Sequence, residues 1–309
     1  MKDVSNKPDS FRSARAQCCL RAPQDCIERL RRGDTDKGDA LKTARIAGIL
    51  AAKRTDELLP LCHPLPIHRA ELEFELGEEQ VTILAEVQTI GPTGVEMEAL
   101  TAAQMAALTL YDMLKPHCRP DQLEITDGRL LEKTGGKSQF RRYLRAPMSA
   151  AVIVLSDTVA AGRKPDTAGR SVEEGLAAAG FEPVHYQVLP DEPDQLREAV
   201  QTQLTEGTAL IVTVGGTGVG PRDCTVDTVQ PMLTTELPGV MEAARDFGQR
   251  RTPYAMMSRG IAGLAGDSVV VTFPGSRRGA EETLAALLPG LVHLLEVCRA
   301  GRPHPGGYQ

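Results

Sequence analysis

The sequence contains no tryptophan and few other aromatic residues, with six Phe and five Tyr among 309 residues. Hydrophobic residues still make up 41% of the chain and charged residues 25%, which are values typical of globular proteins. Aliphatic side chains must therefore form the cores. A chain of this length is predicted to fold as two domains of ordinary size.

The chain also lacks an excess of positive charge, because its formal net charge is -6. General nucleic-acid binding needs a basic surface that neutralises phosphates. We therefore predict no nucleic-acid partner. Any anion-binding site must consist of a local cluster of basic residues.

The seven cysteines are odd in number, and none of them forms a CxxC pair. That pattern disfavours a zinc ribbon, an iron–sulfur cluster and a secreted disulfide framework. The first residues, MKDVSNKPDSF, contain no apolar signal core, and no apolar run reaches transmembrane length. The sequence therefore predicts a reduced cytoplasmic protein without a membrane partner.

The hydrophobic pattern changes at the segment RAPMSA, residues 145–150. Before it, a polar stretch (1–35) precedes predicted helices at 43–54 and 95–115. Alternating residues predict strands at 70–76 and 80–90, and shorter strands follow at 122–126 and 129–132. Residues 1–147 are therefore predicted to form an α+β domain, ferredoxin-like in arrangement.

After the boundary, strands and helices alternate regularly. Apolar runs at 151–156, 209–214 and 268–273 are typical of strands buried on both faces. Another strand is predicted at 183–189, and helices are predicted at 168–179, 194–206 and 279–298. Residues 148–309 are therefore predicted to form a three-layer, doubly wound α/β domain with a mostly parallel sheet.

The predicted helix at 95–115 carries charged residues at both ends, Glu96 and Glu98 at its start and Asp112 and Lys115 near its end. Glu98 and Asp112 are 14 residues apart, which is about 21 Å along a helix. One small site in one chain cannot contain both. If both function, either there are two sites or one site is shared between chains, and we predict an obligate oligomer.

Asp112 and Lys115 lie on one helical face, at positions i and i+3. They form either a surface ion pair or a proton-transfer pair in which the carboxylate orients a lysine of lowered pKa. Lys37, Lys133 and Lys137 would complete a cationic pocket, although Lys133 and Lys137 also fit an ordinary solvated segment. A metal site is not predicted in this half.

Five stretches together resemble cyclic pyranopterin monophosphate synthases of the MoaC type, over about residues 1–145. They are TDKGD (35–39), LCHPL (61–65), TGVEMEAL (93–100), LYDMLK (110–115) and LLEKTGGKS (130–138). The resemblance implies rearrangement of a cyclised 7,8-dihydro-GTP to cyclic pyranopterin monophosphate, with release of pyrophosphate and without a cofactor. It implies Asp112 as the acid/base, assisted by Lys115 and Lys133. The implied substrate-binding residues are Lys37, Leu61, Cys62, His63, Glu96, Met97, Glu98 and Lys137.

In the second half, GGTGVGPRDCT (215–225) follows an apolar strand, where glycines let backbone N–H groups face an anion. The alternative is a plain tight turn. Ser156, Asp191, Gly215 and Pro274 each follow a predicted strand, so they should meet at one sheet edge. Asp191 and Asp223 are candidates for Mg²⁺, although Asp191 could instead cap the helix that follows it.

This loop, together with SDT (156–158), MSRGIAG (257–263) and FPGS (273–276), resembles molybdopterin-binding domains of the MogA and gephyrin type. The resemblance implies adenylylation of molybdopterin with Mg-ATP. The alternative is a noncatalytic molybdopterin-binding or assembly module. The first family is usually hexameric and the second is often trimeric. The resemblance therefore implies a hexamer or a trimer-based homo-oligomer, with pterin and nucleotide substrates as its other partners. The implied binding residues are Ser156, Asp157, Gly215, Gly216, Thr217, Gly218, Arg222, Asp223, Pro274, Gly275 and Ser276.

Overall fold

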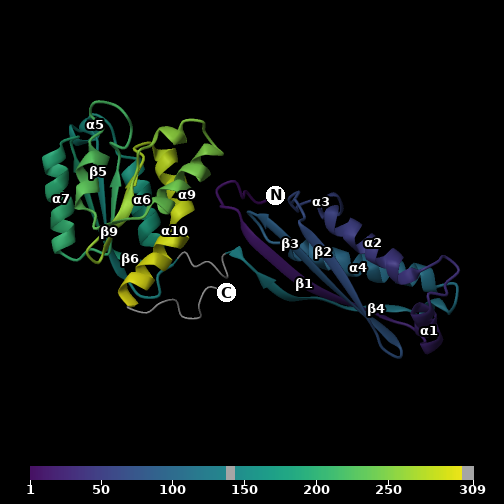
Figure 1. Cartoon of the computed structure of the whole chain (residues 1–309). Helices are drawn as coiled ribbons and strands as arrows, with labels where there is room; N and C mark the ends of the chain where they lie inside the picture. Colours follow the sequence, from purple (N-terminus) through teal and green to yellow (C-terminus); the bar gives the residue numbers. More distant parts are fainter. Residues whose placement is uncertain (137–142, 301–309) are drawn as a thin grey trace. The chain divides into compact units, whose positions relative to one another are not determined.

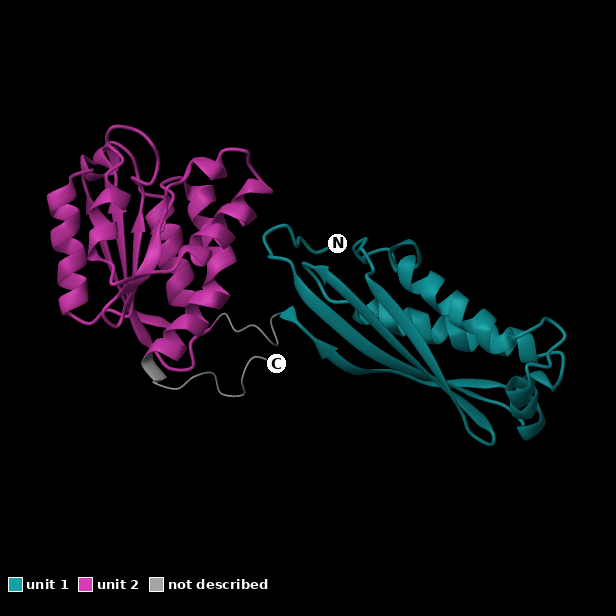
Figure 2. Ribbon diagram, viewed as in Figure 1, with its two compact units in different colours: residues 1–140 teal, residues 141–309 magenta. Residues whose placement is uncertain are grey.

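The computed structural model describes residues 1–136 and 143–300 and divides the chain into two compact units, Met1–Phe140 and Arg141–Gln309 (Figures 1 and 2). The boundary that the sequence predicts, between residues 147 and 148, falls directly before the first strand of the second unit. Lys137, a predicted substrate-binding residue, lies outside the described residues.

The first unit is an antiparallel four-stranded sheet with helices packed against it, in strand order β2-β3-β1-β4 (Figure 1). This unit is α+β as the sequence predicts, whereas its ferredoxin-like arrangement stays a prediction. Its elements are β1 (Ser10–Arg21), α1 (Gln24–Arg32), α2 (Ala40–Lys53), α3 (Thr55–Leu58), β2 (Arg69–Leu76), β3 (Gln80–Gly91), α4 (Glu96–Leu114), η1 (Pro120–Gln122) and β4 (Glu124–Thr134).

The sequence predicts no element in the polar stretch 1–35, but strand β1 forms there. It lies inside the sheet and pairs along its length with β3 on one side and β4 on the other. The two short strands expected at 122–126 and 129–132 are one strand, β4, whose register against β1 is interrupted by bulges. Pairing with distant segments, rather than local pattern, therefore decides both elements.

Helix α4 is fixed against α2 and the sheet by small side chains. Its buried face is rich in alanine, and α2 contributes Gly48, where a Cβ would lie 2.9 Å from the carbonyl oxygen of Ala102. The short side chains let the two helices approach closely. Helix α4 is thus a rigid element whose two ends carry the charged residues that the sequence singles out.

The second unit is a six-stranded sheet in the order β6-β5-β7-β10-β9-β8. The first four of these strands are mutually parallel, and β9 and β8 continue the sheet antiparallel. The elements are β5 (Met148–Leu155), α5 (Asp157–Ala160), α6 (Ala168–Ala178), β6 (Phe181–Leu189), α7 (Pro193–Thr205), β7 (Leu210–Val214), α8 (Thr225–Val229), η3 (Gln230–Met232), β8 (Thr235–Glu236), α9 (Pro238–Gln249), η4 (Ala255–Met257), β9 (Ala262–Ala265), β10 (Ser268–Phe273) and α10 (Arg277–Ala300).

Both faces of this sheet are covered. Val152 and Val154 belong to a core that includes residues of α6, α9 and α10, whereas Ile153 and Leu155 belong to a core with α7. Figure 1 shows α7 on one side of the sheet and α6, α9 and α10 on the other. The predicted three-layer, doubly wound and mostly parallel domain is confirmed, so the carboxyl ends of its parallel strands meet at one edge.

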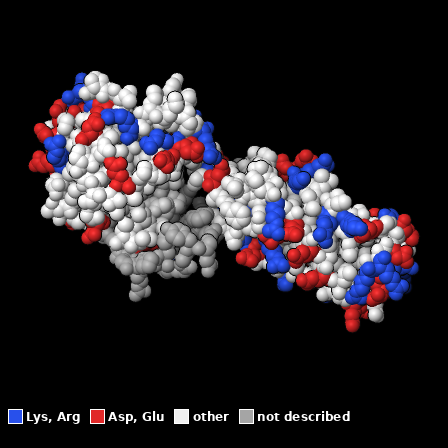
Figure 3. Space-filling view, viewed as in Figure 1, with Lys and Arg blue, Asp and Glu red and all other residues white. Residues whose placement is uncertain are grey.

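Charged side chains of both signs are interspersed over the face of the molecule shown in Figure 3. Among residues 1–136 and 143–300, no helix has both the length and the apolar character that a membrane crossing requires.

Candidate functional site

The end of α4 carries an ion cluster, called here the helix-end cluster, made of Lys37, Asp112 and Lys115. Lys37 Nζ donates to Asp112 Oδ2 at 2.6 Å and to the Asp112 carbonyl oxygen at 3.3 Å. Lys115 Nζ lies 2.8 Å from Asp112 Oδ1. All three side chains are about half exposed. The carboxylate of Asp112 therefore forms ion pairs with two lysines that lie far from each other in the sequence.

The electrostatics of this cluster correct one expectation. Hydrogen bonds from Lys115 and Lys37 lower the pKa of Asp112 to about 2. The hydrogen bond to Asp112 raises the pKa of Lys115, whereas the sequence suggested a lysine of lowered pKa. The reason is that a neighbouring carboxylate stabilises the charged ammonium form. Both Asp112 and Lys115 are therefore held in their ionised states at neutral pH.

The start of α4 carries a second group, called here the helix-start cluster, made of Cys62, Glu96, Glu98 and Lys133. Lys133 Nζ, from β4, donates to Glu96 Oε1 at 2.9 Å. Burial alone would raise the pKa of Glu96, but the hydrogen bond and charge of Lys133 bring it below its ordinary value. Lys133 is thus paired with a predicted site residue rather than part of a plain solvated segment.

Glu98 is only 4% exposed. Within the described residues, its Oε2 has no hydrogen-bond partner. Burial, together with the negative charges of Glu96 and Asp56, raises the pKa of Glu98 to about 7. Burial and the charge of Glu98 also raise the pKa of the Cys62 thiol. Glu98 is therefore a carboxyl group that can exchange a proton near neutral pH.

Glu98 should make the stability of the protein depend on pH. Its pKa is raised by folding from the ordinary 4.5 to about 7, so between these values the folded state binds more protons. The free energy of unfolding should consequently fall by about 3 kcal/mol as pH rises through this window. Urea unfolding at pH 5 and pH 8 should show this decrease in the wild type and not in Glu98→Gln. An equal decrease in Glu98→Gln would contradict the prediction, and exposed Glu57→Gln is the control.

Three other predicted residues of this half, Leu61, His63 and Met97, are neighbours in sequence of the helix-start cluster. Leu61 and Met97 are more exposed than Glu98. Leu61 is 74% exposed and Met97 is 42% exposed. His63 Nε2 lies 2.8 Å from the carbonyl oxygen of Lys2. Within the described residues, Leu61 and Met97 are therefore exposed apolar side chains, and Met97 directly precedes buried Glu98 in the sequence.

The two clusters lie at opposite ends of α4, about 21 Å apart along the helix. The structure thus keeps the separation that the sequence predicts within one chain. Arg12 of β1 donates to the carbonyl oxygens of Gly91 and Pro92 and lowers the pKa of Glu96 by its charge. The sequence does not single out Arg12, because its pattern does not predict β1.

In the second unit, a cleft of about 410 Å³ lies at the carboxyl ends of the parallel strands. Residues that follow four different elements meet there, as the sequence predicts. The predicted residues that line it are Ser156, Asp191, Gly215, Gly216, Asp223, Gly275 and Ser276. Asp157, Thr217, Gly218, Arg222 and Pro274 lie in the same loops but do not line it.

The glycine loop takes a backbone shape that side chains disfavour. Gly215 and Gly216 have φ of 106° and 62°, and a Cβ on Gly215 would lie 2.3 Å from the carbonyl oxygen of Leu155. Thr225 Oγ1 donates to the Gly215 carbonyl oxygen at 2.8 Å. Arg259 donates to the carbonyl oxygens of Gly218 and Asp223 at 2.8 and 2.9 Å. The loop is therefore held by side chains from other elements, more than a plain tight turn requires.

Arg222 is engaged within the chain. It donates to both carboxylate oxygens of Asp157 at 3.0–3.2 Å and to Glu192 Oε1 at 3.0 Å. Asp157 and Asp191 also form two reciprocal hydrogen bonds. The Asp157 N–H donates to Asp191 Oδ2 at 2.9 Å, and the Asp191 N–H donates to Asp157 Oδ1 at 3.0 Å. Hydrogen bonds from Arg222 and from the Asp191 N–H lower the pKa of Asp157.

Asp191 does not cap α7, because Glu192 holds the N-cap position and no side chain caps that helix end. Burial and the neighbouring charges of Asp157 and Asp223 raise the pKa of Asp191. Asp191 and Asp223 line one cleft and repel each other, so a cation between them would be favourable. The described residues include no cluster of three or more metal-ligating side chains. A magnesium ion that arrives with a nucleotide needs only one or two carboxylates, so this pair fits it.

The cleft also contains two cationic residues that the sequence motifs do not single out, Lys164 and Arg277. Arg277 opens α10, and its Nε donates to Glu281 Oε1 at 2.8 Å. A basic residue in the first turn of a helix opposes the helix dipole. The position of Arg277 at the start of α10 is therefore unfavourable for the helix itself, and it indicates an anion-binding cleft.

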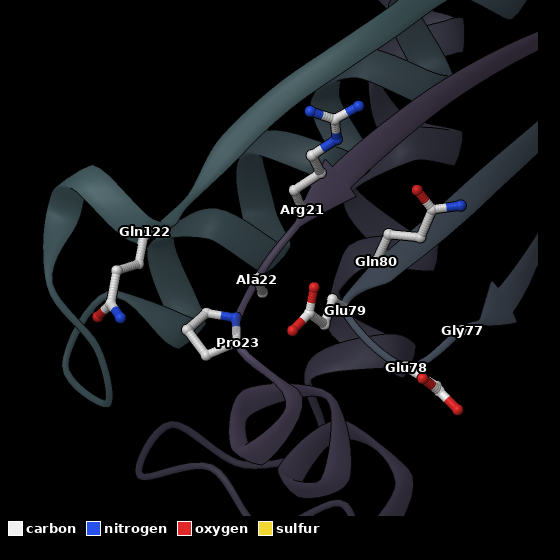
Figure 4. Close-up of a pocket in the computed structure, with 8 residues that line it drawn as sticks. All are labelled: Arg21, Ala22, Pro23, Gly77, Glu78, Glu79, Gln80 and Gln122. Carbon is white, nitrogen blue, oxygen red and sulfur yellow. The ribbon is translucent and has the colours of Figure 1, made fainter.

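A further hollow, of about 680 Å³, lies at one end of the first unit's sheet (Figure 4). It lies between the end of β1, the β2–β3 turn and η1. Arg21 is paired with Glu124 at 3.4 Å, and Glu78, Glu79 and Gln122 are exposed. None of the predicted site residues lines this hollow, and nothing in its chemistry indicates a ligand.

Comparisons with known proteins match both units. Residues 1–136 match the MoaC family, and residues 151–293 match the family described as probable molybdopterin binding domain. The molybdenum cofactor biosynthesis bifunctional protein of Chlorobaculum tepidum is 44% identical over 293 residues, which cover 95% of this chain and 92% of that protein.

Relatives with a single unit are found as well. A cyclic pyranopterin monophosphate synthase of Corynebacterium efficiens is 50% identical over 139 residues, 45% of this chain and 88% of that protein. A crystal structure of a molybdopterin biosynthesis protein from Mycobacterium abscessus is 37% identical and covers 50% of this chain and 97% of that one, with a TM-score of 0.48.

Proposed function

Since this chain belongs to the family of bifunctional molybdenum cofactor biosynthesis proteins, with a MoaC part and a molybdopterin-binding part, we propose that each unit catalyses its own reaction. The first unit converts cyclised 7,8-dihydro-GTP to cyclic pyranopterin monophosphate. The observation that supports this reaction is the pair of lysine–carboxylate clusters at the two ends of α4.

The chemistry of the first reaction suits these clusters. A substrate hydroxyl attacks the α-phosphorus of the triphosphate, the bond to the β-phosphate breaks, and pyrophosphate leaves with the electron pair. The side chains of Lys37 and Lys115, both positioned by Asp112, neutralise the charge that develops on the departing phosphates. Glu98, with a pKa near 7, can exchange the protons that the rearrangement moves.

The site is proposed to form between chains. Asp112 and Glu98 are too far apart to serve one substrate within a chain, whereas antiparallel α4 helices of two subunits would bring unlike ends together. This arrangement also covers exposed Leu61 and Met97 beside the helix-start cluster. The helix-end cluster of one subunit then completes the helix-start cluster of its neighbour.

Pyrophosphate release from cyclised dihydro-GTP tests the first reaction. The intact chain should release one pyrophosphate per substrate consumed. Lys133→Ala should reduce the rate about 100-fold, because it removes the cation paired with Glu96. Lys53→Ala, at the exposed end of α2, is the matched control and should retain the wild-type rate. Full activity in Lys133→Ala would contradict the assignment.

The second unit is proposed to bind molybdopterin and adenylylate it with Mg-ATP. A phosphate oxygen of molybdopterin attacks the α-phosphorus of ATP, and pyrophosphate leaves. Backbone N–H groups of the glycine loop, with Lys164 and Arg277, offer the cleft's anion contacts. Asp191 and Asp223 would hold the magnesium ion, which supplies charge neutralisation at the phosphates.

One observation favours a second candidate, a noncatalytic molybdopterin-binding or assembly module. The guanidinium of Arg222 is engaged by Asp157 and Glu192 instead of being directed into the cleft. Adenylyl transfer would require Arg222 to exchange these carboxylates for phosphate. A module that only binds molybdopterin would not require that exchange, and ATP turnover separates the two candidates.

A further inference from the structure

Arg259, between η4 and β9, has an acceptor for each of its three side-chain nitrogens. Its Nε donates to the carbonyl oxygen of Gly218 at 2.8 Å, and its Nη2 donates to the carbonyl oxygen of Asp223 at 2.9 Å. Its Nη1 donates to both carboxylate oxygens of Asp227, at 3.0 and 3.1 Å. The backbone N–H of Arg259 donates to the carbonyl oxygen of Thr217 at 2.9 Å. One residue thus binds three carbonyl groups of the glycine loop.

These contacts decide the direction of the N–H groups in the loop. In a planar trans peptide, the carbonyl and the N–H of one peptide unit point in opposite directions. Because the carbonyl groups of Thr217 and Gly218 face Arg259, the N–H groups of Gly218 and Val219 face away from it. Neither N–H donates to an acceptor among the residues that the structure describes. An anion can therefore accept from both.

A second set of N–H groups beside the cleft is already paired. At the start of α6, the carboxylate of Asp166 accepts from the N–H groups of Ala168, Gly169 and Arg170 at 3.0–3.2 Å. A phosphate would have to displace this carboxylate to reach them. The start of α6 is thus a poorer anion site than the glycine loop.

The charge of Arg259 is not itself directed at the cleft. Its partner Asp227 supplies a negative charge at 3.0 Å, and neither residue lines the cleft. Asp223 does line it, and Arg259 holds the carbonyl group of Asp223 while Asp223 Oδ2 accepts the Gly220 N–H at 2.7 Å. Arg259 therefore acts on the shape of the loop rather than on a ligand.

We propose that Arg259 is a positioning residue for phosphate binding in the second unit. It holds the carbonyl groups of the glycine loop, so that the N–H groups of the loop and the carboxylate of Asp223 are presented to a phosphate and its magnesium. This role rests on the anion binding proposed above for the loop and adds the residue that orients the loop. The motif MSRGIAG (257–263) thereby gains a function at the cleft.

Calorimetric titration of the full chain with inorganic pyrophosphate and Mg²⁺ tests this role. Arg259→Ala should bind pyrophosphate about 10- to 100-fold more weakly than the wild type, because each misdirected hydrogen bond to a charged group costs about tenfold. Arg259→Lys should be nearly as weak, since one ammonium cannot reach acceptors that three guanidinium nitrogens span. Guanidinium at millimolar concentration should restore binding to Arg259→Ala, whereas methylammonium should not. The difference from the wild type removes binding by the first unit.

Asp227→Asn separates positioning from direct attraction of the anion. It removes the charge that neutralises Arg259, and it should bind pyrophosphate no more tightly than the wild type. Tighter binding by Asp227→Asn, or wild-type affinity in Arg259→Lys, would show that the charge of Arg259 acts on the anion and overturns the proposal. Unchanged affinity in Arg259→Ala, or a loss that guanidinium does not restore, overturns it as well.

The matched control is Arg197→Ala on α7, which breaks an ion pair with Asp194 and does not line the cleft. It should bind pyrophosphate like the wild type, and the Arg259 variants should melt near the wild-type temperature. Pyrophosphate binding that depends on Arg259, in a protein without molybdopterin-dependent ATP turnover, would support the positioning role and refute adenylyl transfer alone.

Discussion

Asp112→Asn is expected to release pyrophosphate from cyclised dihydro-GTP about 1000-fold more slowly than the wild type. The substitution keeps the size of the side chain but removes the negative charge that Lys37 and Lys115 share at 2.6 and 2.8 Å. Both ammonium groups would then lose their anchor and repel each other. Because Asp112 positions both lysines, Asp112→Asn should reduce the rate of pyrophosphate release more than substitution of Lys37 or Lys115 alone.

A matched control for this variant is Asp121→Asn, which removes an exposed carboxylate paired with Arg119 in the same unit. It should leave the rate unchanged. Because Asp112 is half exposed, Asp112→Asn should change the free energy of unfolding little, so an inactive variant that unfolds normally supports a functional role. A rate within threefold of the wild type would show that the helix-end cluster is only a surface ion network.

Mixed oligomers extend the same prediction to the shared site. Glu98→Gln and Asp112→Asn should each be inactive alone, since every site contains one damaged cluster. When the two are co-expressed with different tags and purified as mixed oligomers, about one quarter of the sites should combine two intact clusters. Recovery of activity near that fraction supports a site between chains. No recovery in verified mixed oligomers would contradict a site that combines the two clusters from different chains.

In the first unit, the local sequence pattern predicts helix α4 but not the central strand β1. The uninterrupted run at 95–115 gives α4 and the separation of its charged ends, because helical rise alone fixes that distance. Strand β1 is not predictable in this way. Its segment mixes Arg and Ser with small residues such as Ala14, Ala16 and Cys18, and only pairing with β3 and β4 makes it a central strand.

The same distinction holds for the sites. Four strand ends predict one cleft in the second unit, because a parallel sheet brings carboxyl ends together. The partners of individual side chains are not predictable, because they depend on loop paths. The pairing of Lys133 with Glu96 and the engagement of Arg222 by Asp157 and Glu192 arise from contacts between segments far apart in the chain.

Asp191→Asn is the second variant expected to have a large effect, on the adenylyl transfer proposed for the second unit. Molybdopterin- and Mg-ATP-dependent pyrophosphate release should fall about 1000-fold, because one of two carboxylates available to magnesium is lost. Asp223→Ala should have a similar effect. Asp194→Asn, an exposed residue three positions later on α7, should retain activity.

The stability of Asp191→Asn should move in the opposite direction from its activity. Burial and the charges of Asp157 and Asp223 raise the pKa of Asp191, so the ionised carboxylate is disfavoured in the folded state at neutral pH. Asparagine removes that charge and still accepts the N–H of Asp157, so urea unfolding at pH 7 should show equal or greater stability. The adenylyl transfer activity of the wild type should decline as pH falls through the raised pKa of Asp191, because the protonated carboxyl group no longer offers a negative charge to magnesium. If the wild type binds molybdopterin but shows no ATP-dependent turnover, the second unit is a binding module, in which Arg222 keeps its carboxylate partners.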